Sequence, residues 1–258
     1  MEIVFLGTAG SVARKDRDNT SLLIKEKGSY LLVDVPGAVV QKLRKLSIDY
    51  FQINNIFITH IHPDHIYGLP SFIHARMFDA QSTINIYGHK KSVEFVQKLL
   101  TLFNLKRNKF PKIKFYRLHS KSHFSVSDSF YINTFKTRHS AESLGLKIEY
   151  KNKTIIYTSD TAYSQNVIKT ATGADYLIHD CFAPTRFFRT YPLLEKMHTS
   201  THAVAEVYKK SKVKTLIPIH FSGEFNFKIS EISTEFRKLG VKNFILPKDL
   251  QILKINYR

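Results

Sequence analysis

Short hydrophobic runs separated by turn residues recur along the whole chain. The runs are rich in isoleucine, leucine, valine and phenylalanine, and glycine, proline, asparagine or aspartate stands between them. Runs this short, bounded by turn residues, predict β-strands rather than buried helices. The predicted strands cover residues 1–6, 21–25, 30–33, 56–58, 84–87, 130–137, 146–150, 154–158, 176–179 and 215–219.

Apolar residues at helical spacing follow several of these strands. They predict helices over residues 39–46, 70–78, 92–103, 203–210 and around 232–239. No repeat or low-complexity linker divides the chain, and 258 residues can bury a large core in one domain. The pattern therefore predicts a single α/β domain over residues 1–258, with two strand-rich halves that each carry helices.

Three histidines and an aspartate gather directly after the predicted strand 56–58, in the stretch THIHPDH at residues 59–65. His60 and His62 stand two apart on an extended segment and point the same way, whereas Asp64 and His65 on the following turn reach a second point a few ångströms away. These side chains are ligands of divalent metal ions. A group of surface histidines beside a turn is the alternative, but this spacing after an apolar strand favours a metal site.

The stretch resembles the His-x-His-x-Asp-His motif of the metallo-β-lactamase superfamily, and the resemblance extends over nearly the whole chain. His139, Asp160 and His220 each follow a later predicted strand, where the superfamily has its remaining ligands. The resemblance implies a four-layer αββα sandwich. It also implies that His60, His62 and His139 hold one metal ion, that Asp64, His65 and His220 hold a second, and that Asp160 bridges the two.

A ligand set of nitrogen and oxygen atoms suits zinc, and manganese and iron are compatible with it as well. Two divalent ions outweigh the charge of two aspartates and a hydroxide, so the centre would stay net positive. A centre of this kind favours an anionic substrate and lowers the pKa of a bound water to roughly 7.

Within the superfamily, the chain is most similar to ribonuclease Z and its small phosphodiesterase relatives. Residues 6–8 (LGT) and 19–21 (NTS) resemble their amino-terminal signature. Asp34, at the end of the predicted strand 30–33, matches the aspartate that supports the metal-binding histidines in these relatives. An ordinary turn-forming role is the alternative for Asp34.

Two further motifs bear on catalysis. Residues 198–201 (HTST) lie where ribonuclease Z has His-Ser-Thr, and residues 179–182 (HDCF) lie where it has His-Glu-Ala-Thr. The resemblance implies that His198 contacts the scissile phosphate or protonates the leaving oxygen, and that Asp180 holds it. We therefore expect Asp64, His198 and Asp180 to carry catalysis. His202, one helical turn later, is a weaker candidate.

The chain departs from ribonuclease Z in one segment. The enzyme carries a long flexible arm that grips tRNA between the third histidine and the bridging aspartate. Only 20 residues separate His139 from Asp160, and two predicted strands and a turn occupy them. The arm is absent, and a homodimer that supplies the grip in trans is one hypothesis for its replacement.

The charge of the chain is strongly positive. Its 39 Lys and Arg residues against 21 Asp and Glu residues give a net charge of +18. No acidic residue occurs between Phe95 and Ser127, and aromatic residues interleave with the basic ones there. We expect this stretch to bind a nucleic-acid backbone; a solvated face with core aromatics is the alternative. The substrate-binding residues that it predicts are Lys106, Arg107, Lys109, Lys112 and Lys114.

Composition predicts the compartment. Cys181 is the only cysteine, which excludes an intrachain disulfide, and no leader peptide or membrane-spanning run is evident. We therefore expect a cytoplasmic protein without a membrane partner.

The function that this sequence favours is a dinuclear phosphodiesterase, a ribonuclease Z-like endoribonuclease that acts on RNA, with tRNA 3′ processing as one role. A small-molecule phosphodiesterase acting on cyclic nucleotides or cyclic phosphates is the first alternative. A non-catalytic RNA-binding module is the second, and the full ligand set argues against it.

Overall fold

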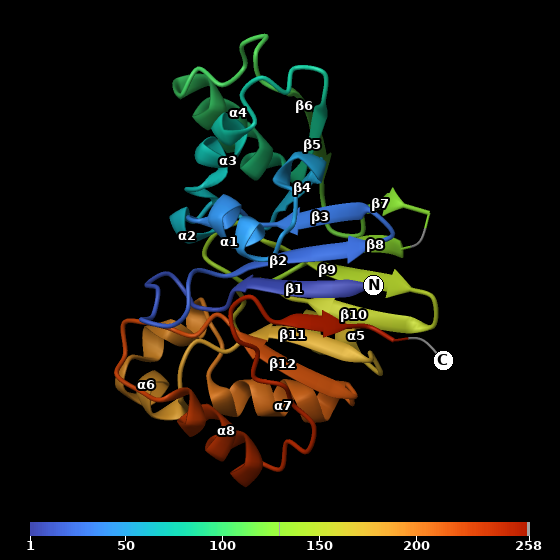
Figure 1. The fold of residues 1–258 in the computed structure, drawn as a ribbon. Coiled ribbons are helices and arrows are strands. Elements are labelled where there is room, and N and C mark those ends of the chain that lie inside the picture. Colours follow the sequence, from blue (N-terminus) through green and yellow to red (C-terminus); the bar gives the residue numbers. More distant parts are fainter. Residues whose placement is uncertain (129, 257–258) are drawn as a thin grey trace.

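The computed structural model describes residues 1–128 and 130–256. Within them, the chain forms two β-sheets that lie face to face (Figure 1). The first sheet has the strand order β13-β1-β2-β3-β4-β5-β6 and the second has the order β12-β11-β10-β9-β8-β7. The strands of the first sheet are β1 (Glu2–Gly7), β2 (Ser21–Glu26), β3 (Ser29–Val33), β4 (Asn55–Ile58), β5 (Thr83–His89), β6 (Lys112–Leu118) and β13 (Ile252–Lys254). The strands of the second are β7 (His123–Ser127), β8 (Phe130–Lys136), β9 (Leu144–Tyr150), β10 (Lys153–Tyr157), β11 (Tyr176–Asp180) and β12 (Thr215–Ile219).

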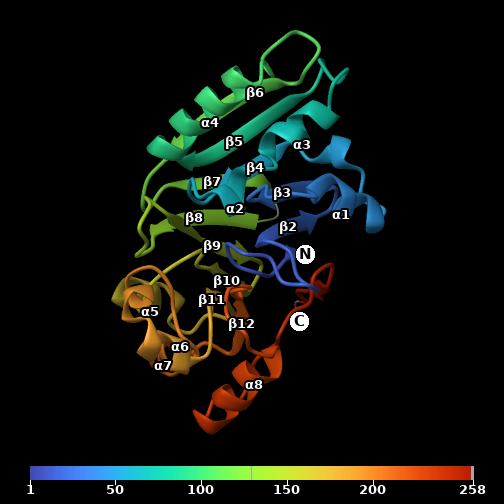
Figure 2. The ribbon, with the colours of Figure 1, turned by 90° about the vertical axis from the view of Figure 1, so that its left-hand side faces the viewer.

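Helices cover the outer face of each sheet, which completes the predicted αββα sandwich (Figure 2). The helices on the first sheet are α1 (Val39–Lys45), α3 (Leu69–Ala75) and α4 (Lys90–Leu102), and the short α2 (Pro63–Ile66) precedes α3. The helices of the second half are α5 (Gln165–Ala171), α6 (Thr185–Thr190), α7 (Thr201–Ser211) and α8 (Ile229–Lys238). Two 3₁₀ turns, Tyr50–Gln52 and Pro192–Lys196, complete the described elements.

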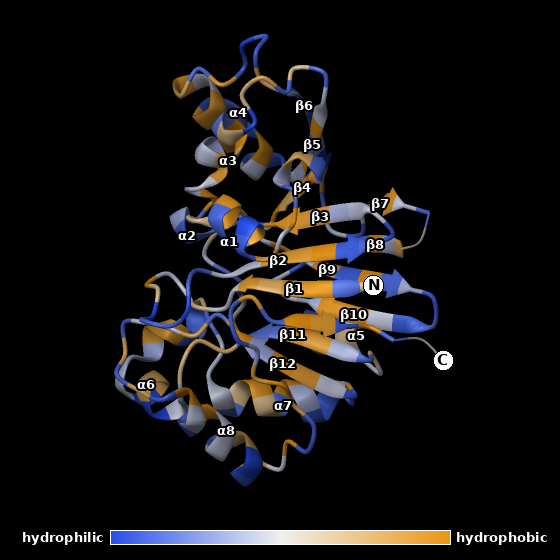
Figure 3. Cartoon of the chain, in the orientation of Figure 1, coloured by the Kyte–Doolittle hydropathy of each residue, from blue (hydrophilic) through white to orange (hydrophobic). Residues whose placement is uncertain are grey.

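Alternation along the strands builds three layers of core. In β1, Ile3 and Phe5 join the apolar cluster between the two sheets. Val4 and Leu6 point to the opposite face and join the cluster beneath α1, α3 and α4. A third cluster lies between the second sheet and α5, α7 and α8. Because both faces of the central strands are buried, consecutive residues in the middle of these strands are hydrophobic, as Figure 3 shows for β1 and β12.

Parallel pairing places several strand ends together. β3, β4, β5 and β6 run parallel, and so do β10, β11 and β12. The carboxyl ends of parallel strands meet at one edge of a sheet, where open α/β sheets carry their sites. The amide of Leu144 donates to the carbonyl of Thr59 across 3.2 Å, and that of Phe221 donates to Thr8 across 3.0 Å, so the two sheet edges are joined.

The predicted elements are present with small shifts at their ends, and several others were not predicted. β6 lies in the basic stretch, where charge concealed the alternation of Lys112 and Lys114 with Ile113 and Phe115. The other unpredicted elements are α2, β7, α5, α6 and β13.

Candidate metal centre

The centre begins at the turn that leaves β4. His60 and His62 lie on this turn, and His62 stands at the N-cap of α2 with an extended backbone. Pro63 is the first residue of α2, where its fixed φ suits the start of a helix and its missing N–H costs no hydrogen bond. The short helix then presents Asp64 and His65, both buried, to the same space.

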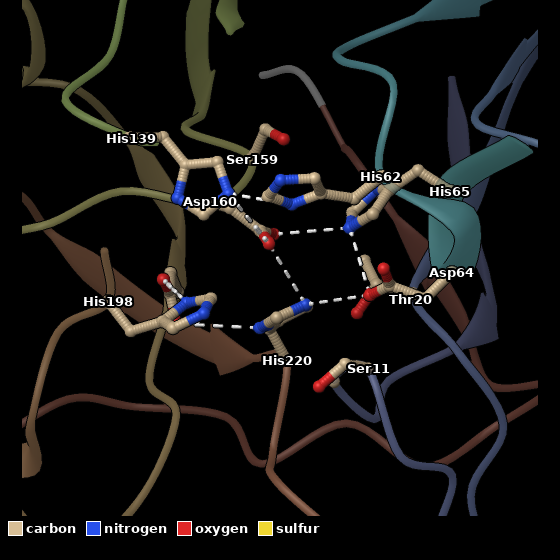
Figure 4. Close-up of polar contacts among 12 residues, drawn as sticks. Ser11, Thr20, His62, Asp64, His65, His139, Ser159, Asp160, His198 and His220 are labelled. Carbon is tan, nitrogen blue, oxygen red and sulfur yellow. Dashed lines mark hydrogen bonds and ion pairs between the residues drawn. The ribbon is translucent and has the colours of Figure 1, made fainter. Parts of the chain in front are cut away.

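Three later strand ends reach this space from the second sheet (Figure 4). His139 follows β8, Asp160 follows β10 and His220 follows β12. Two groups of donor atoms result, each within 4.8 Å of one another, and Asp160 belongs to both. One group is His60, His62, His139 and Asp160; the other is Asp64, His65, Asp160 and His220. The structure thus brings together all seven predicted ligands.

The spacing of the donor atoms suits two metal ions. Nδ1 of His62 lies 3.0 Å from Nε2 of His139, and Nε2 of His220 lies 3.2 Å from Oδ2 of Asp160. Nε2 of His65 lies 3.3 Å from Asp64 and 3.4 Å from Asp160. Ligands at the bond lengths of a tetrahedral zinc site stand about 3.3 Å apart. No side chain has to move far to reach such a geometry.

Buried polar atoms without a hydrogen-bond partner provide a second test. Among the described residues, Nε2 of His60, His65 and His220 and Oδ1 of Asp160 are buried and make no hydrogen bond. An unsatisfied buried polar group costs about 1–3 kcal/mol, so four that converge on one space require a compensating partner. Divalent cations supply that partner, and these residues fit them.

The electrostatics of the cluster suit cation binding. Burial would raise the pKa of Asp160, but the nearby His220 and His65 hold it well below its usual value. Burial would likewise raise the pKa of Asp64, but the nearby rings of His220 and His65 lower it. Burial lowers the pKa of His60 well below its usual value. Burial would lower the pKa of His65 and His220, but the carboxylate of Asp160 raises the first well above its usual value and the second to about 10. Metal coordination needs neutral imidazole, so cations at this position replace the protons of these two rings, whereas Asp160, Asp64 and His60 are already in the required state.

A shell of hydrogen bonds orients the ligands. Asp34 is fully buried, and its Oδ2 lies 2.8 Å from Nδ1 of His65. The amide and hydroxyl of Thr59 also donate to Asp34, and the same hydroxyl lies 2.9 Å from Nδ1 of His60. Nδ1 of His139 lies 2.8 Å from the carbonyl of Met197. Each ring is thereby held with its other nitrogen toward the centre, which is how supporting residues act in metal sites.

His198 lies beside the cluster, at its rim. Its Nδ1 is 2.9 Å from Oδ2 of Asp180, and its side chain is 11% exposed. The ring stacks on Phe182 at 4.2 Å between centroids and lies 5.2 Å from the ring of His220. Burial would raise the pKa of Asp180, but His198 and His220 lower it, so the carboxylate is ionised beside His198. The predicted pair therefore has the required geometry.

The predicted substrate-binding lysines lie elsewhere. Lys112 and Lys114 are at the start of β6, where they pair with Thr83 and Asn85 of β5. The metal centre lies at the opposite end of these parallel strands, beyond Ile58. Lys106, Arg107 and Lys112 line a separate cavity of about 590 Å³. We call Lys106, Arg107, Lys109, Lys112 and Lys114 the distal basic patch; the structure does not bring it to the centre.

Other basic residues, which were not predicted from the sequence, do lie beside the centre. Lys91, Lys136 and Arg138 line a cavity that also includes His62 and His139. Arg138 directly precedes the ligand His139, which is the signal that would have identified it.

Comparisons with known proteins identify the family of this chain. The sequence profile of the family described as "Anti-Pycsar protein Apyc1" matches residues 1–237. The chain belongs to this family. It is 25% identical, over 311 aligned positions, to the ribonuclease Z of Methanosarcina mazei, covering 100% of this chain and 99% of that relative.

Solved structures give the fold. The metallo-β-lactamase fold protein YhfI from Bacillus subtilis superposes with a TM-score of 0.82 at 20% identity, covering 98% of both chains. The human tRNase Z, short form, superposes with a TM-score of 0.80 at 21% identity, covering 100% of both chains. The family member described here is therefore a ribonuclease Z-like, metal-dependent hydrolase of the metallo-β-lactamase fold.

The helices of the protein are short or amphipathic. Within residues 1–128 and 130–256, none is long and apolar enough to cross a membrane.

Proposed function

We propose that this chain is a dinuclear phosphodiesterase whose substrate is RNA. The observation that carries the proposal is the pair of donor groups that share Asp160, next to His198, whose Nδ1 lies 2.9 Å from Asp180 and which forms a third donor group with Asp180 and His220. The first feature is the arrangement of a two-metal hydrolase, and the second is that of a general acid. The ribonuclease Z proteins similar to this chain support RNA as the substrate.

The proposed ligands are His60, His62 and His139 for one ion, Asp64, His65 and His220 for the other, and Asp160 for both. When bound, two divalent ions polarise a phosphoryl oxygen and lower the pKa of the attacking water to about 7. Zinc suits the ligand types, and manganese and iron are compatible with them.

The protein's own groups supply orientation and a proton. Asp34 and Thr59 fix the rings of His65 and His60. Asp180 keeps Nδ1 of His198 engaged, which leaves Nε2 as the atom that gives a proton to the departing oxygen. General acid catalysis of this kind contributes about 10²-fold to 10⁴-fold.

A second candidate substrate is a small phosphodiester such as a cyclic nucleotide or cyclic phosphate. β9 ends at Tyr150 and β10 begins at Lys153, so no arm stands between His139 and Asp160. The alignment to the Methanosarcina mazei relative also runs over 311 positions, whereas this chain has 258 residues. The relative therefore carries segments that this chain lacks, which favours a smaller substrate.

The two substrates are separated by one comparison. Zinc-loaded and manganese-loaded protein is incubated with a tRNA precursor, an unstructured RNA and a set of cyclic nucleotides, with Asp160→Ala as the inactive control. Cleavage of either RNA at a higher kcat/KM than the cyclic nucleotides supports the first proposal. The reverse order establishes the second candidate, and no metal-dependent cleavage of any of them refutes both.

A further inference from the structure

Two cavities flank the metal centre, and each reaches a different part of it. The first, of about 710 Å³, includes His62 and His139 in its wall. The second, of about 640 Å³, includes His198. Both volumes lie in the range of cavities that bind small organic molecules, and each is large enough for a nucleoside.

Arg138 lines both cavities. Its place is fixed by the chain around it, because its amide donates to Oγ1 of Thr161 and its carbonyl accepts from Ala162. Its exposed side chain, whose Nη1 donates to the carbonyl of Tyr163 across 3.5 Å, shares the wall of the first cavity with His139, whose Nε2 lies 3.8 Å from Asp160. Arg138 is therefore the basic side chain at the junction of the two cavities, beside the centre.

Each cavity also has basic residues of its own. Lys91, near the start of α4, and Lys136, at the end of β8, line the first cavity. Arg189, in the last turn of α6, lines the second cavity together with the buried ring of Phe188. A positive side chain beside an apolar ring suits a ribose–phosphate and a base.

We propose that the two cavities are the two nucleoside subsites of a phosphodiester substrate and that Arg138 binds the phosphate between them. This inference rests on the proposed function. The second cavity takes the leaving nucleoside because His198, the proton donor, lines that cavity and not the first. The first cavity takes the nucleoside that keeps the phosphate.

The assignment fixes the direction of the reaction across the site. A water oxygen bonds to phosphorus, the P–O bond on the side of the second cavity breaks, and the proton of His198 goes to the departing oxygen. Of the two protons of the attacking water, one restores the proton of His198, and the other stays on the new phosphate or is released to solvent. The products are a nucleoside in the second cavity and a nucleoside monophosphate in the first.

Three substrates distinguish the subsites. The dinucleotide UpU has a nucleoside on both sides, thymidine 5′-p-nitrophenyl phosphate has one only on the phosphate-retaining side, and bis-p-nitrophenyl phosphate has none. The variants are Arg189→Ala, Lys91→Ala and Arg138→Ala. The controls are Arg186→Ala on the helix of Arg189 and Lys98→Ala on the helix of Lys91.

Loss of a charge-assisted contact raises KM about tenfold. We expect Arg189→Ala to raise the ratio of KM for UpU to KM for the thymidine ester by this factor. Lys91→Ala should raise KM for both of these substrates relative to bis-p-nitrophenyl phosphate, and Arg138→Ala should raise it for all three. The controls should leave these ratios within about twofold.

Two results overturn the assignment while the enzyme remains active. In one, Arg189→Ala affects the thymidine ester and Lys91→Ala affects only UpU, which reverses the direction. In the other, neither variant differs from its control. If the wild type hydrolyses none of the substrates, the proposed function has failed instead. The affinity for 5′-UMP then tests the subsite assignment by itself. Lys91→Ala should weaken binding of 5′-UMP about tenfold, and Arg189→Ala should leave it unchanged. Equal affinities of the two variants would refute the assignment of the two cavities.

Discussion

His198 is the residue to which the proposed function gives the most specific role. Asp180 occupies its Nδ1, and the ring stacks on Phe182 and lies beside the ring of His220 at the rim of the cluster. A ring held this way donates a proton in one direction. Replacing it therefore separates proton donation from simple phosphate binding.

We expect His198→Ala to keep both metals and to lower kcat for RNA by about 10²-fold to 10⁴-fold. The loss should be much smaller with bis-p-nitrophenyl phosphate, because p-nitrophenolate leaves without a proton. Asp180→Asn should reproduce part of the defect, since the carboxylate of Asp180 orients the His198 ring through Nδ1. Equal losses of kcat on both substrates would mean that His198 binds phosphate and donates no proton.

Asp34 acts one step further from the centre. It accepts from both Thr59 and His65 while fully buried, so its removal frees a ligand ring. We expect Asp34→Asn to weaken metal affinity about 10-fold to 100-fold, as measured by competition with a chelator. The matched control is Asp49→Asn, which removes the charge of a carboxylate that caps only an exposed 3₁₀ turn. An unchanged affinity in Asp34→Asn would leave Asp34 with the turn-forming role alone.

The identity of the proposed metal ligands could be predicted from the sequence, whereas the backbone conformation that orients them could not. The seven ligands could be predicted because they resemble a superfamily motif and because each lies shortly after a hydrophobic strand. The left-handed backbone of Asp34, Ser159 and His220, with φ of 60°, 55° and 65°, could not, because these residues usually avoid it. Tertiary contacts impose that conformation at the strand ends.

Among the elements, α2 carries two ligands on a single turn and depends on a glycine just beyond its end. Gly68 lies against the segment after β3: a Cβ at this position would stand 2.0 Å from the carbonyl oxygen of Pro36. Its amide also donates to the carbonyl of Val35, and the amide of Val35 donates to His65. The backbone contact that Gly68 permits thus positions the end of α2.

We expect Gly68→Ala to destabilise the fold by about 1–3 kcal/mol, because the backbone must shift to relieve the clash. Thermal unfolding would show this as a Tm lower by about 2–10 °C. Activity should fall as well, since the shift moves Asp64 and His65. The control is Gly173→Ala, where a Cβ meets nothing within 4 Å and only the positive φ is strained. Identical Tm and activity in Gly68→Ala and wild type would contradict this view of α2.

The elements also show where sequence patterns mislead. The alternation in β6 was interpreted as a charged stripe because lysines occupy its exposed positions. Its aromatic residues are divided: Phe110 is buried and Phe115 packs on the helix-covered core, whereas Phe103 is exposed and Tyr116 stacks on Tyr87. Phe110 and Phe115 therefore belong to the core, and binding of a nucleic-acid backbone by this stretch stays a prediction.

Across the whole molecule, the net charge of +18 favours a polyanionic substrate. The positions of the basic residues also allow a test of whether that substrate is a long one. The distal basic patch lies at the far end of the sheet from the centre. Only a substrate that spans this length can engage both. We therefore expect the KM of a long RNA to rise steeply with salt and that of UpU to change little.

Each phosphate contact on a single strand contributes roughly 0.7 to the log–log salt slope. The double variant Lys106→Ala/Lys109→Ala should lower the slope for long RNA by about 1.4 and leave KM for UpU unaltered. Lys209→Ala/Lys212→Ala, on and just after α7, is the control for loss of charge alone. Salt slopes that match between the two double variants would identify the distal basic patch as a solvated face.

The αββα sandwich could be predicted because the motif at residues 59–65 resembles that of a superfamily whose other ligands match His139, Asp160 and His220. The convergence of the seven side chains could not be derived from spacing alone, since β4, β8, β10 and β12 belong to different sheets. The cavities beside the centre also depend on long-range packing, which is why Lys91 and Arg189 were missed.

The proposed mechanism depends on two metal ions that share Asp160. The most direct measurement is anomalous diffraction at the zinc edge from crystals of the metal-loaded protein, with elemental analysis of the same sample. We expect two anomalous peaks per chain, one among His60, His62 and His139 and one among Asp64, His65 and His220, with Asp160 in contact with both. A single peak, or a second peak away from His220, would contradict the claim.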